Sequence, residues 1–159
     1  SNAAYDILED NIELSECRQG MPDATFDPVP MRIMDRGDRV VTESVEYNTT
    51  RTIYLDSATS PEPAFSATGY STGRWAGDTL IVTTSHIDWP YWSEWGLPLS
   101  KQATVLETYR VSEDGNSLEL STTVIDPVMF NRPFSLTRTR GWTPGLEFPP
   151  YECVVNWEK

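Results

Sequence analysis

Turn signals recur at short intervals along most of this chain, and they limit the folds open to it. From residue 31 onward, segments rich in threonine, valine, isoleucine and tyrosine alternate with Gly, Asp and Asn residues. Such segments are typical of β-strands, and Asp-Gly or Gly-Asn pairs favour hairpin turns. The connections leave no room for the helical crossovers that parallel strands need. We expect strands at residues 31–35, 39–47, 50–56, 69–76, 78–85, 102–111, 117–125, 133–142 and 151–157.

These segments predict an all-β protein with about nine strands in a single antiparallel meander. Gly73-Arg74-Trp75 is similar to the Gly-x-Trp of lipocalins, which favours closure as a lipocalin-like β-barrel. A β-sandwich is the alternative. The β-domain is expected at residues 31–159 and an N-terminal arm at residues 4–30. Within the arm, residues 4–16 could form a short helix or a mobile segment, and residues 17–30 are expected to be extended or looped. Residues 1–3 are interpreted as an expression-tag remnant.

The chain is acidic, with 12 Lys and Arg residues against 24 Asp and Glu residues. Nucleic acids and anionic membranes both reward clustered positive charge, so we expect no nucleic-acid partner. No apolar run approaches the roughly 20 residues of a membrane-spanning helix, so we expect no membrane insertion.

Two cysteines, Cys17 and Cys153, lie near opposite ends of the sequence. A disulfide between them would close almost the whole chain as a loop, whereas the alternative is two unrelated buried thiols. We favour the disulfide, which is typical of oxidising compartments and predicts a periplasmic or secreted protein.

Several charged residues fall among apolar residues on one face of a predicted strand. Glu43 accompanies Val41, Val45 and Tyr47, and Glu107 accompanies Val105, Tyr109 and Val111. Because buried charges need partners, we expect Glu43 to pair with Arg51, and Glu107 to pair with Arg138 or Arg140. The alternative is that the charged ends reach water. Inward charges would line a polar cavity in which a ligand could bind.

Aromatic residues and the single histidine supply further candidate residues for a ligand pocket. Trp75 is a large apolar anchor, and Trp89, Tyr91, Trp92 and Trp95 occupy a long loop at residues 86–101. That loop either stacks on a ligand or forms a lid over one end of the barrel. His86 is the only histidine, which excludes a multi-histidine metal site. We expect no metal and no cofactor. The pocket candidates are Glu43, Arg51, Trp75, His86, Trp89, Trp92 and Glu107.

GYSTG, residues 69–73, matches the G-x-S-x-G pattern of serine hydrolases. That pattern places a nucleophile only at a strand-to-helix turn, and strands surround it here, so we expect Ser71 to be structural.

GYSTGRWAGDTLIVTT, residues 69–84, resembles the G-x-S-x-G-R-W-E-G-D-T-L-V-V-x-T signature of a family of uncharacterised exported bacterial proteins. CRQGMP, RTIYLD, LPLS, ETYRV and IDPVMFNRPF are similar to further segments of that family, in the same order, so that the resemblance covers about residues 17–140. The resemblance implies export and a β-rich fold.

Three functions are compatible with these features. The first is a binding module that holds a small amphipathic ligand in its interior. The second is a hydrolase or isomerase that uses an interior carboxylate and His86. The third is a structural domain with a filled core. The sequence leaves open which ligand would bind and what the oligomeric state is.

Overall fold

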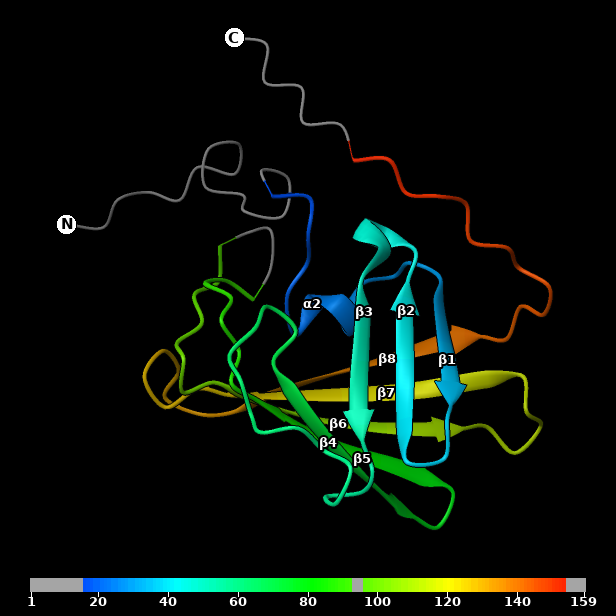
Figure 1. The fold of residues 1–159 in the computed structure, drawn as a ribbon, viewed down its shortest axis with the longest axis horizontal. Helices are drawn as coiled ribbons and strands as arrows, with labels where there is room; N and C mark the ends of the chain where they lie inside the picture. The colour runs from blue at the N-terminus through cyan, green and yellow to red at the C-terminus, as the bar shows by residue number, and fades with distance from the viewer. Residues whose placement is uncertain (1–15, 93–95, 154–159) are drawn as a thin grey trace, which may run out of the picture.

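The computed structural model describes residues 16–92 and 96–153, which form one sheet of eight strands and little helix (Figure 1). A short helix, α2 (Asp23–Phe26), precedes the sheet, and a 3-10 turn, η1 (Glu46–Asn48), joins the second strand to the third. The prediction of an all-β protein is confirmed. The strands are β1 (Met31–Asp35), β2 (Arg39–Ser44), β3 (Thr50–Tyr54), β4 (Tyr70–Ala76), β5 (Thr79–Ser85), β6 (Thr104–Val111), β7 (Ser117–Ile125) and β8 (Phe134–Gly141).

Neighbouring strands are antiparallel except for β3 and β4, which run parallel where Ile53 faces Ser71. The prediction of a purely antiparallel meander is therefore wrong at this step. Parallel pairing needs a crossover of about a dozen residues or more, and the loop at residues 55–69 provides it. Gly73 allows the close contact that follows, because a Cβ atom there would lie 2.8 Å from Cγ2 of Ile53.

The sheet is curled but not closed. In its order, β1 and β8 are the two edges, and no ladder joins them in the described part of the chain. Figure 1 shows β1, β2 and β3 crossing in front of β6, β7 and β8, so that the sheet bends around an interior. The architecture is a half-barrel, and the predicted closed barrel is not observed.

Two other predicted strands differ from the structure. The strand expected at residues 39–47 ends at Ser44, since the chain then enters η1, where Tyr47 and Asn48 have φ values of 52° and 49°. The strand expected at residues 151–157 is absent from residues 151–153, and its remainder lies outside the described residues.

The arm at residues 17–30, expected to be extended or looped, contains α2. The helix or arm expected at residues 4–16 lies, apart from Glu16, outside the described residues. None of the helices in the described ranges is long and apolar enough to cross a membrane.

Two apolar clusters occupy the interior of the half-barrel. The two clusters lie at different positions along β6. Val105 belongs to one cluster and Tyr109 to the other, and Glu107 lies between them on the strand. The lid-side cluster consists of Met21, Ala24, Ile87, Trp89, Trp92, Leu99, Ala103, Val105 and Val124. The open-side cluster consists of Val40, Ile53, Leu80, Val82, Tyr109 and Leu120.

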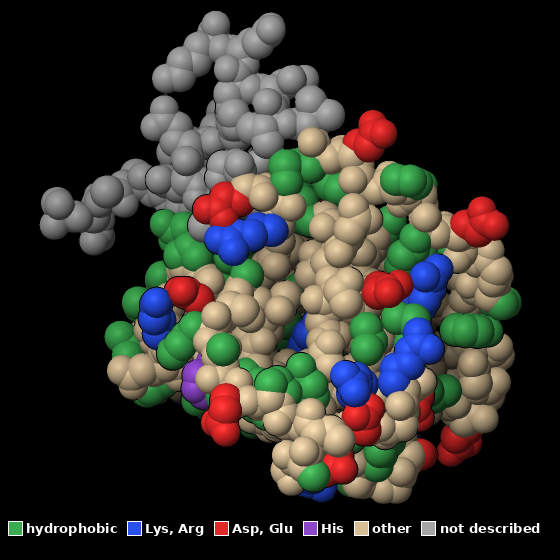
Figure 2. All heavy atoms as spheres, viewed as in Figure 1, with side chains coloured by type: hydrophobic (Ala, Val, Ile, Leu, Met, Phe, Trp, Pro, Cys, Tyr) green, Lys and Arg blue, Asp and Glu red, His purple; other side chains and the backbone are tan. Residues whose placement is uncertain are grey.

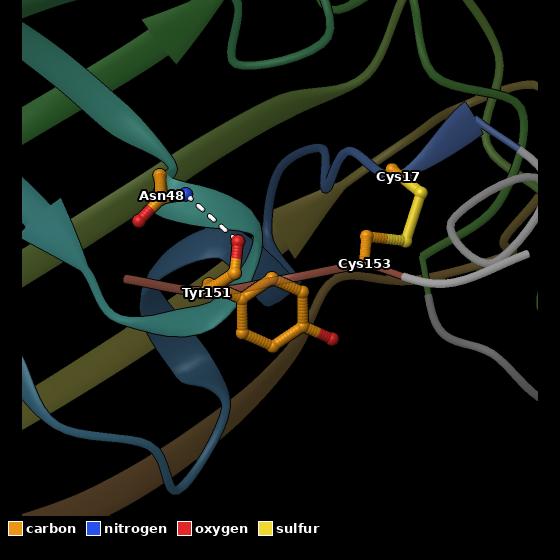
Figure 3. The surroundings of a disulfide bond; sticks show 4 residues. All are labelled: Cys17, Asn48, Tyr151 and Cys153. Atoms are coloured by element: carbon orange, nitrogen blue, oxygen red, sulfur yellow. Dashed lines mark hydrogen bonds between the residues drawn. A yellow bond between two sulfur atoms is a disulfide. The ribbon is translucent and has the colours of Figure 1, made fainter. Parts of the chain in front are cut away.

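The chain after β8 forms a C-terminal strap, residues 142–153, which is joined to the N-terminal arm by a disulfide between Cys17 and Cys153. Figure 3 shows this bond beside Tyr151, whose carbonyl oxygen accepts a hydrogen bond of 3.3 Å from Nδ2 of Asn48. The Tyr151 ring also packs against Tyr47, with ring centroids 5.0 Å apart. The predicted disulfide is thus confirmed, and Tyr151 holds the neighbouring part of the strap against the η1 turn.

Removing the disulfide is expected to destabilise the protein. The bonded cysteines are 136 residues apart, and a cross-link over such a long loop lowers the entropy of the unfolded chain. We expect the double variant Cys17→Ser/Cys153→Ser to lose about 2–5 kcal/mol of unfolding free energy, measured by urea denaturation. Equal stability, or two free thiols in the unreduced and unfolded wild type, would contradict this account.

Candidate functional site

A buried ion pair between Arg51 on β3 and Glu107 on β6 separates the two apolar clusters. Nη2 of Arg51 donates to Oε2 of Glu107 at 2.5 Å, and the two side chains are 2% and 0% exposed. The second carboxylate oxygen, Oε1, accepts hydrogen bonds from Thr25 at 2.7 Å and from the Tyr109 hydroxyl at 3.0 Å. Both oxygens of Glu107 are therefore occupied by protein donors.

The guanidinium of Arg51 is bonded just as fully. Its Nε donates to Ser71 at 2.9 Å, its Nη2 to Thr84 at 2.6 Å, and its Nη1 to Tyr109 at 3.3 Å. The Ser71 hydroxyl is therefore bonded within the interior, to Arg51 and to Thr84. Burial acts to lower the pKa of Arg51, but Glu107 and Tyr109 outweigh it and the pKa is raised. Burial and the Glu107 charge raise the pKa of Tyr109, which keeps its hydroxyl protonated.

These contacts correct the predicted ion pairs. Arg51 pairs with Glu107, whereas Glu43 pairs with the exposed Arg32 on β1 at 3.2 Å. The inward face of β2 carries Val40, Thr42 and Ser44, and Thr42 is the residue opposite Arg51. Glu43 therefore points to the outer face, because neighbouring residues on a strand face opposite ways.

A cavity of about 840 Å³ lies beside the open-side cluster, between the two edges of the half-barrel. The buried side chains of Val40, Ile53, Leu80 and Tyr109 contribute to it. The strap lines another part through Leu146 and neighbouring residues. We call this space the strap cavity. Its volume is typical of small-molecule sites.

Large apolar side chains that line the strap cavity are exposed to solvent. Trp142 is 71% exposed and Trp75 is 52% exposed, and both line the cavity. Ile33, Val111 and Leu146 are further lining residues that are exposed. Contiguous exposed apolar surface of this kind marks ligand or protein binding sites. A smaller cavity of about 450 Å³ lies elsewhere, beside Tyr54 and Tyr70.

Among the pocket candidates predicted from sequence, only Trp75 lines the strap cavity. Trp89 and Trp92 are buried in the lid-side cluster, where Trp92 stacks near Phe134 with ring centroids 4.5 Å apart. Gly20 admits the Trp89 ring, since a Cβ atom at Gly20 would lie 2.1 Å from it. Trp89 and Trp92 are thus interior packing residues, and Trp95 lies outside the described residues.

His86 is half-buried and does not line the strap cavity. Its Nδ1 is 2.8 Å from the Ser85 hydroxyl, and its ring contacts Phe65 and Tyr70. No group of three or more His, Cys, Asp or Glu residues in the described ranges could hold a metal ion. The contacts of His86 are with Ser85, Phe65 and Tyr70, whereas Glu107 is bonded to Thr25, Arg51 and Tyr109.

Asp126 is a buried residue whose importance sequence reasoning missed. Its carboxylate accepts hydrogen bonds from the backbone and hydroxyl of Ser100 at 2.6 and 2.8 Å, and from the backbone of Val128 and Met129. Burial acts to raise the pKa of Asp126, but these hydrogen bonds outweigh it and the pKa is lowered. Asp126 thereby joins residues 97–100 to residues 125–134.

The cavity residues on the strap and on β8 were also missed. Arg138, Arg140 and Trp142 share the inward face of β8 and its continuation, but the cavity that they line arises only when the strap crosses toward β1. Residues 134, 136, 138 and 140 share one face of the strand, and this pattern predicted that the arginines face inward. The pattern does not predict that a cavity lies beside them.

Comparison of the chain with protein-family models, curated proteins and solved structures finds no match.

Separating the contributions of Arg51 and Glu107 tests whether this pair holds the interior together. Glu107→Gln leaves a buried guanidinium without its counter-charge and is expected to cost about 3–5 kcal/mol of unfolding free energy, as is Arg51→Met. The double variant should cost clearly less than the sum, because it leaves no unpaired charge. Urea denaturation of the four proteins gives the coupling free energy.

The exposed Arg32–Glu43 pair is the matched control. Arg32→Met and Glu43→Gln should each change stability by no more than about 1 kcal/mol. Additive losses for Arg51 and Glu107, or losses as small as those of the control pair, would show that the buried pair has no special role.

Proposed function

We propose that this protein binds a small amphipathic molecule in the strap cavity. The observation that carries the proposal is the set of exposed apolar side chains around one cavity: Ile33, Trp75, Val111, Trp142 and Leu146. Covering such surface with an apolar ligand is favourable at about 25 cal/mol per Å². Charged groups at the same cavity, which include Arg138 and Asp35, supply polar contacts for the other end of the molecule.

We further propose that the protein is exported to the periplasm or secreted, as a member of the exported family that its 69–84 segment resembles. The Cys17–Cys153 disulfide supports this, because such bonds persist in oxidising compartments. On the face shown in Figure 2, basic side chains lie beside acidic ones and form no broad basic surface. That arrangement favours a small ligand over nucleic acid as the partner.

The two alternative functions draw less support from the described residues. A hydrolase or isomerase would need His86 and a carboxylate at one ligand position, whereas Glu107 is bonded within the interior and neither residue lines the strap cavity. A purely structural role accounts for the filled layer around Arg51. It does not account for the exposed tryptophans Trp75 and Trp142.

A neutral fluorescent probe tests the proposal. Phenylnaphthylamine emits strongly when bound in an apolar site, and we expect saturable binding of one probe per chain. Leu146→Glu should weaken binding about fivefold or more, because it replaces part of the apolar wall with a charge. Fluorescence titration measures both affinities.

Leu97→Glu is the matched control, since Leu97 is an exposed leucine that does not line the strap cavity. Its affinity for the probe should equal that of the wild type. The proposal fails if the wild type shows no saturable binding, or if the two glutamate variants bind the probe equally well.

A further inference from the structure

Two arginines from β8, Arg138 and Arg140, lie on one wall of the strap cavity. Both are half-buried, and the Nε atom of each is buried without a hydrogen-bond partner. They are two residues apart on one strand, so they face the same side. Burial and the neighbouring Arg138 charge lower the pKa of Arg140, which reflects the closeness of two like charges.

Arg140 already has a structural task. Its Nη1 donates to the carbonyl oxygen of Val29 at 2.7 Å, and its Nη2 donates to those of Thr25 and Asp27, each at 2.6 Å. The guanidinium thereby fastens the segment before β1 to the opposite edge strand, β8. Its terminal nitrogens are thus engaged with backbone acceptors.

In the described part of the chain, no carbonyl oxygen accepts a hydrogen bond from Arg138. Its guanidinium lies 4.6 Å from the centroid of the Phe26 ring, and this is a cation–π contact. Among the described residues, no carboxylate forms an ion pair with Arg138. A half-buried arginine without a counter-charge is unusual, because removing the charge from water costs free energy that a partner normally offsets.

The two carboxylates that line the strap cavity, Asp35 at the end of β1 and Asp78 in a turn, are exposed. Asp35 accepts a hydrogen bond of 2.7 Å from the backbone N–H of Gly37, and Asp78 lies in the turn between β4 and β5, near the Thr79 hydroxyl. The third arginine of the cavity, Arg32, pairs with Glu43. Of the three arginines that line the strap cavity among the described residues, Arg138 is therefore the one available to a ligand.

We propose that Arg138 binds an anionic head group of the ligand, a carboxylate, sulfate or phosphate, while the apolar body lies along the tryptophans and the strap. This inference rests on the proposed function and names its ligand class. Guanidinium donors match such oxyanions in geometry and charge. Trp142 shares the face of Arg138 just beyond the end of β8, and Leu146 follows on the strap, so apolar surface continues away from the cation.

A pair of probes with one skeleton isolates the head group. Anilinonaphthalene sulfonate differs from phenylnaphthylamine by its sulfonate, and we expect it to bind the wild type about tenfold more tightly. The net charge of −12 opposes any anion, so this preference must come from a local cation. Equal or weaker binding of the sulfonate would overturn the inference while leaving the proposed function intact. Failure of both probes to bind would reject the proposed function itself.

Substitutions test whether Arg138 causes the preference for the sulfonate probe over the neutral probe. Arg138→Gln should remove this preference, with about a tenfold loss of sulfonate affinity and unchanged affinity for the neutral probe. Arg138→Lys should retain much of the preference, and near-ultraviolet circular dichroism of both variants monitors native packing. Arg74→Gln is the charge-matched control, since Arg74 is exposed and does not line the strap cavity. A preference that survives Arg138→Gln, or that Arg74→Gln removes equally, would contradict the assignment.

Competition for the neutral probe distinguishes the sources of the anion. Decanoate and decyl phosphate should each displace phenylnaphthylamine better than decanol does. The stronger of the two identifies a fatty-acid-like or a phospholipid-like head group. Displacement by decanol that equals both anions would overturn the inference.

Discussion

A guanidinium buried in a protein interior is stable only when an ionised partner and further hydrogen bonds replace the water that it has lost. Arg51 and Glu107 meet this condition by bonding to Thr25, Ser71, Thr84 and Tyr109. These residues come from α2, β3, β4, β5 and β6, so the pair joins the N-terminal arm to most of the half-barrel. The interior is thereby divided into an end where Ala24 of α2 packs in one cluster with Trp89 and Trp92, and an end that stays open.

The open end of the half-barrel is lined by segments that lie far apart in the sequence. The strap forms one wall of the cavity, and its end is held by the Cys17–Cys153 disulfide beside Tyr151 and Asn48 (Figure 3). Phe148 of the strap also lies under the Arg32 guanidinium, 4.5 Å from it. The strap cavity is thus bounded by a covalently fixed segment on one side and by the arginines of β8 on another.

Sequence reasoning recovered the features that depend on neighbouring residues. Strand alternation and turn residues placed the observed strands correctly within a few residues, and the positions of Cys17 and Cys153 indicated their bond. Features that depend on the assembled sheet were missed. The parallel β3–β4 pairing, the gap between β1 and β8 and the strap cavity all require knowledge of where distant segments lie. Glu43 was expected to pair with Arg51 because residues 41, 43, 45 and 47 were expected to face inward. The inward face carries Val40, Thr42 and Ser44 instead, and a shift of one residue turns every side chain of a strand to the other face.

The central claim is that the open end of the half-barrel is a ligand site with its cation at Arg138. A crystal structure of the protein with a fatty acid that carries bromine at its terminal carbon tests this claim most directly. We predict an anomalous bromine peak against the apolar wall near Trp142 and Leu146, with the carboxylate toward Arg138. A peak beside Tyr54 and Tyr70, or a strap cavity that stays empty at saturating ligand, would contradict the account.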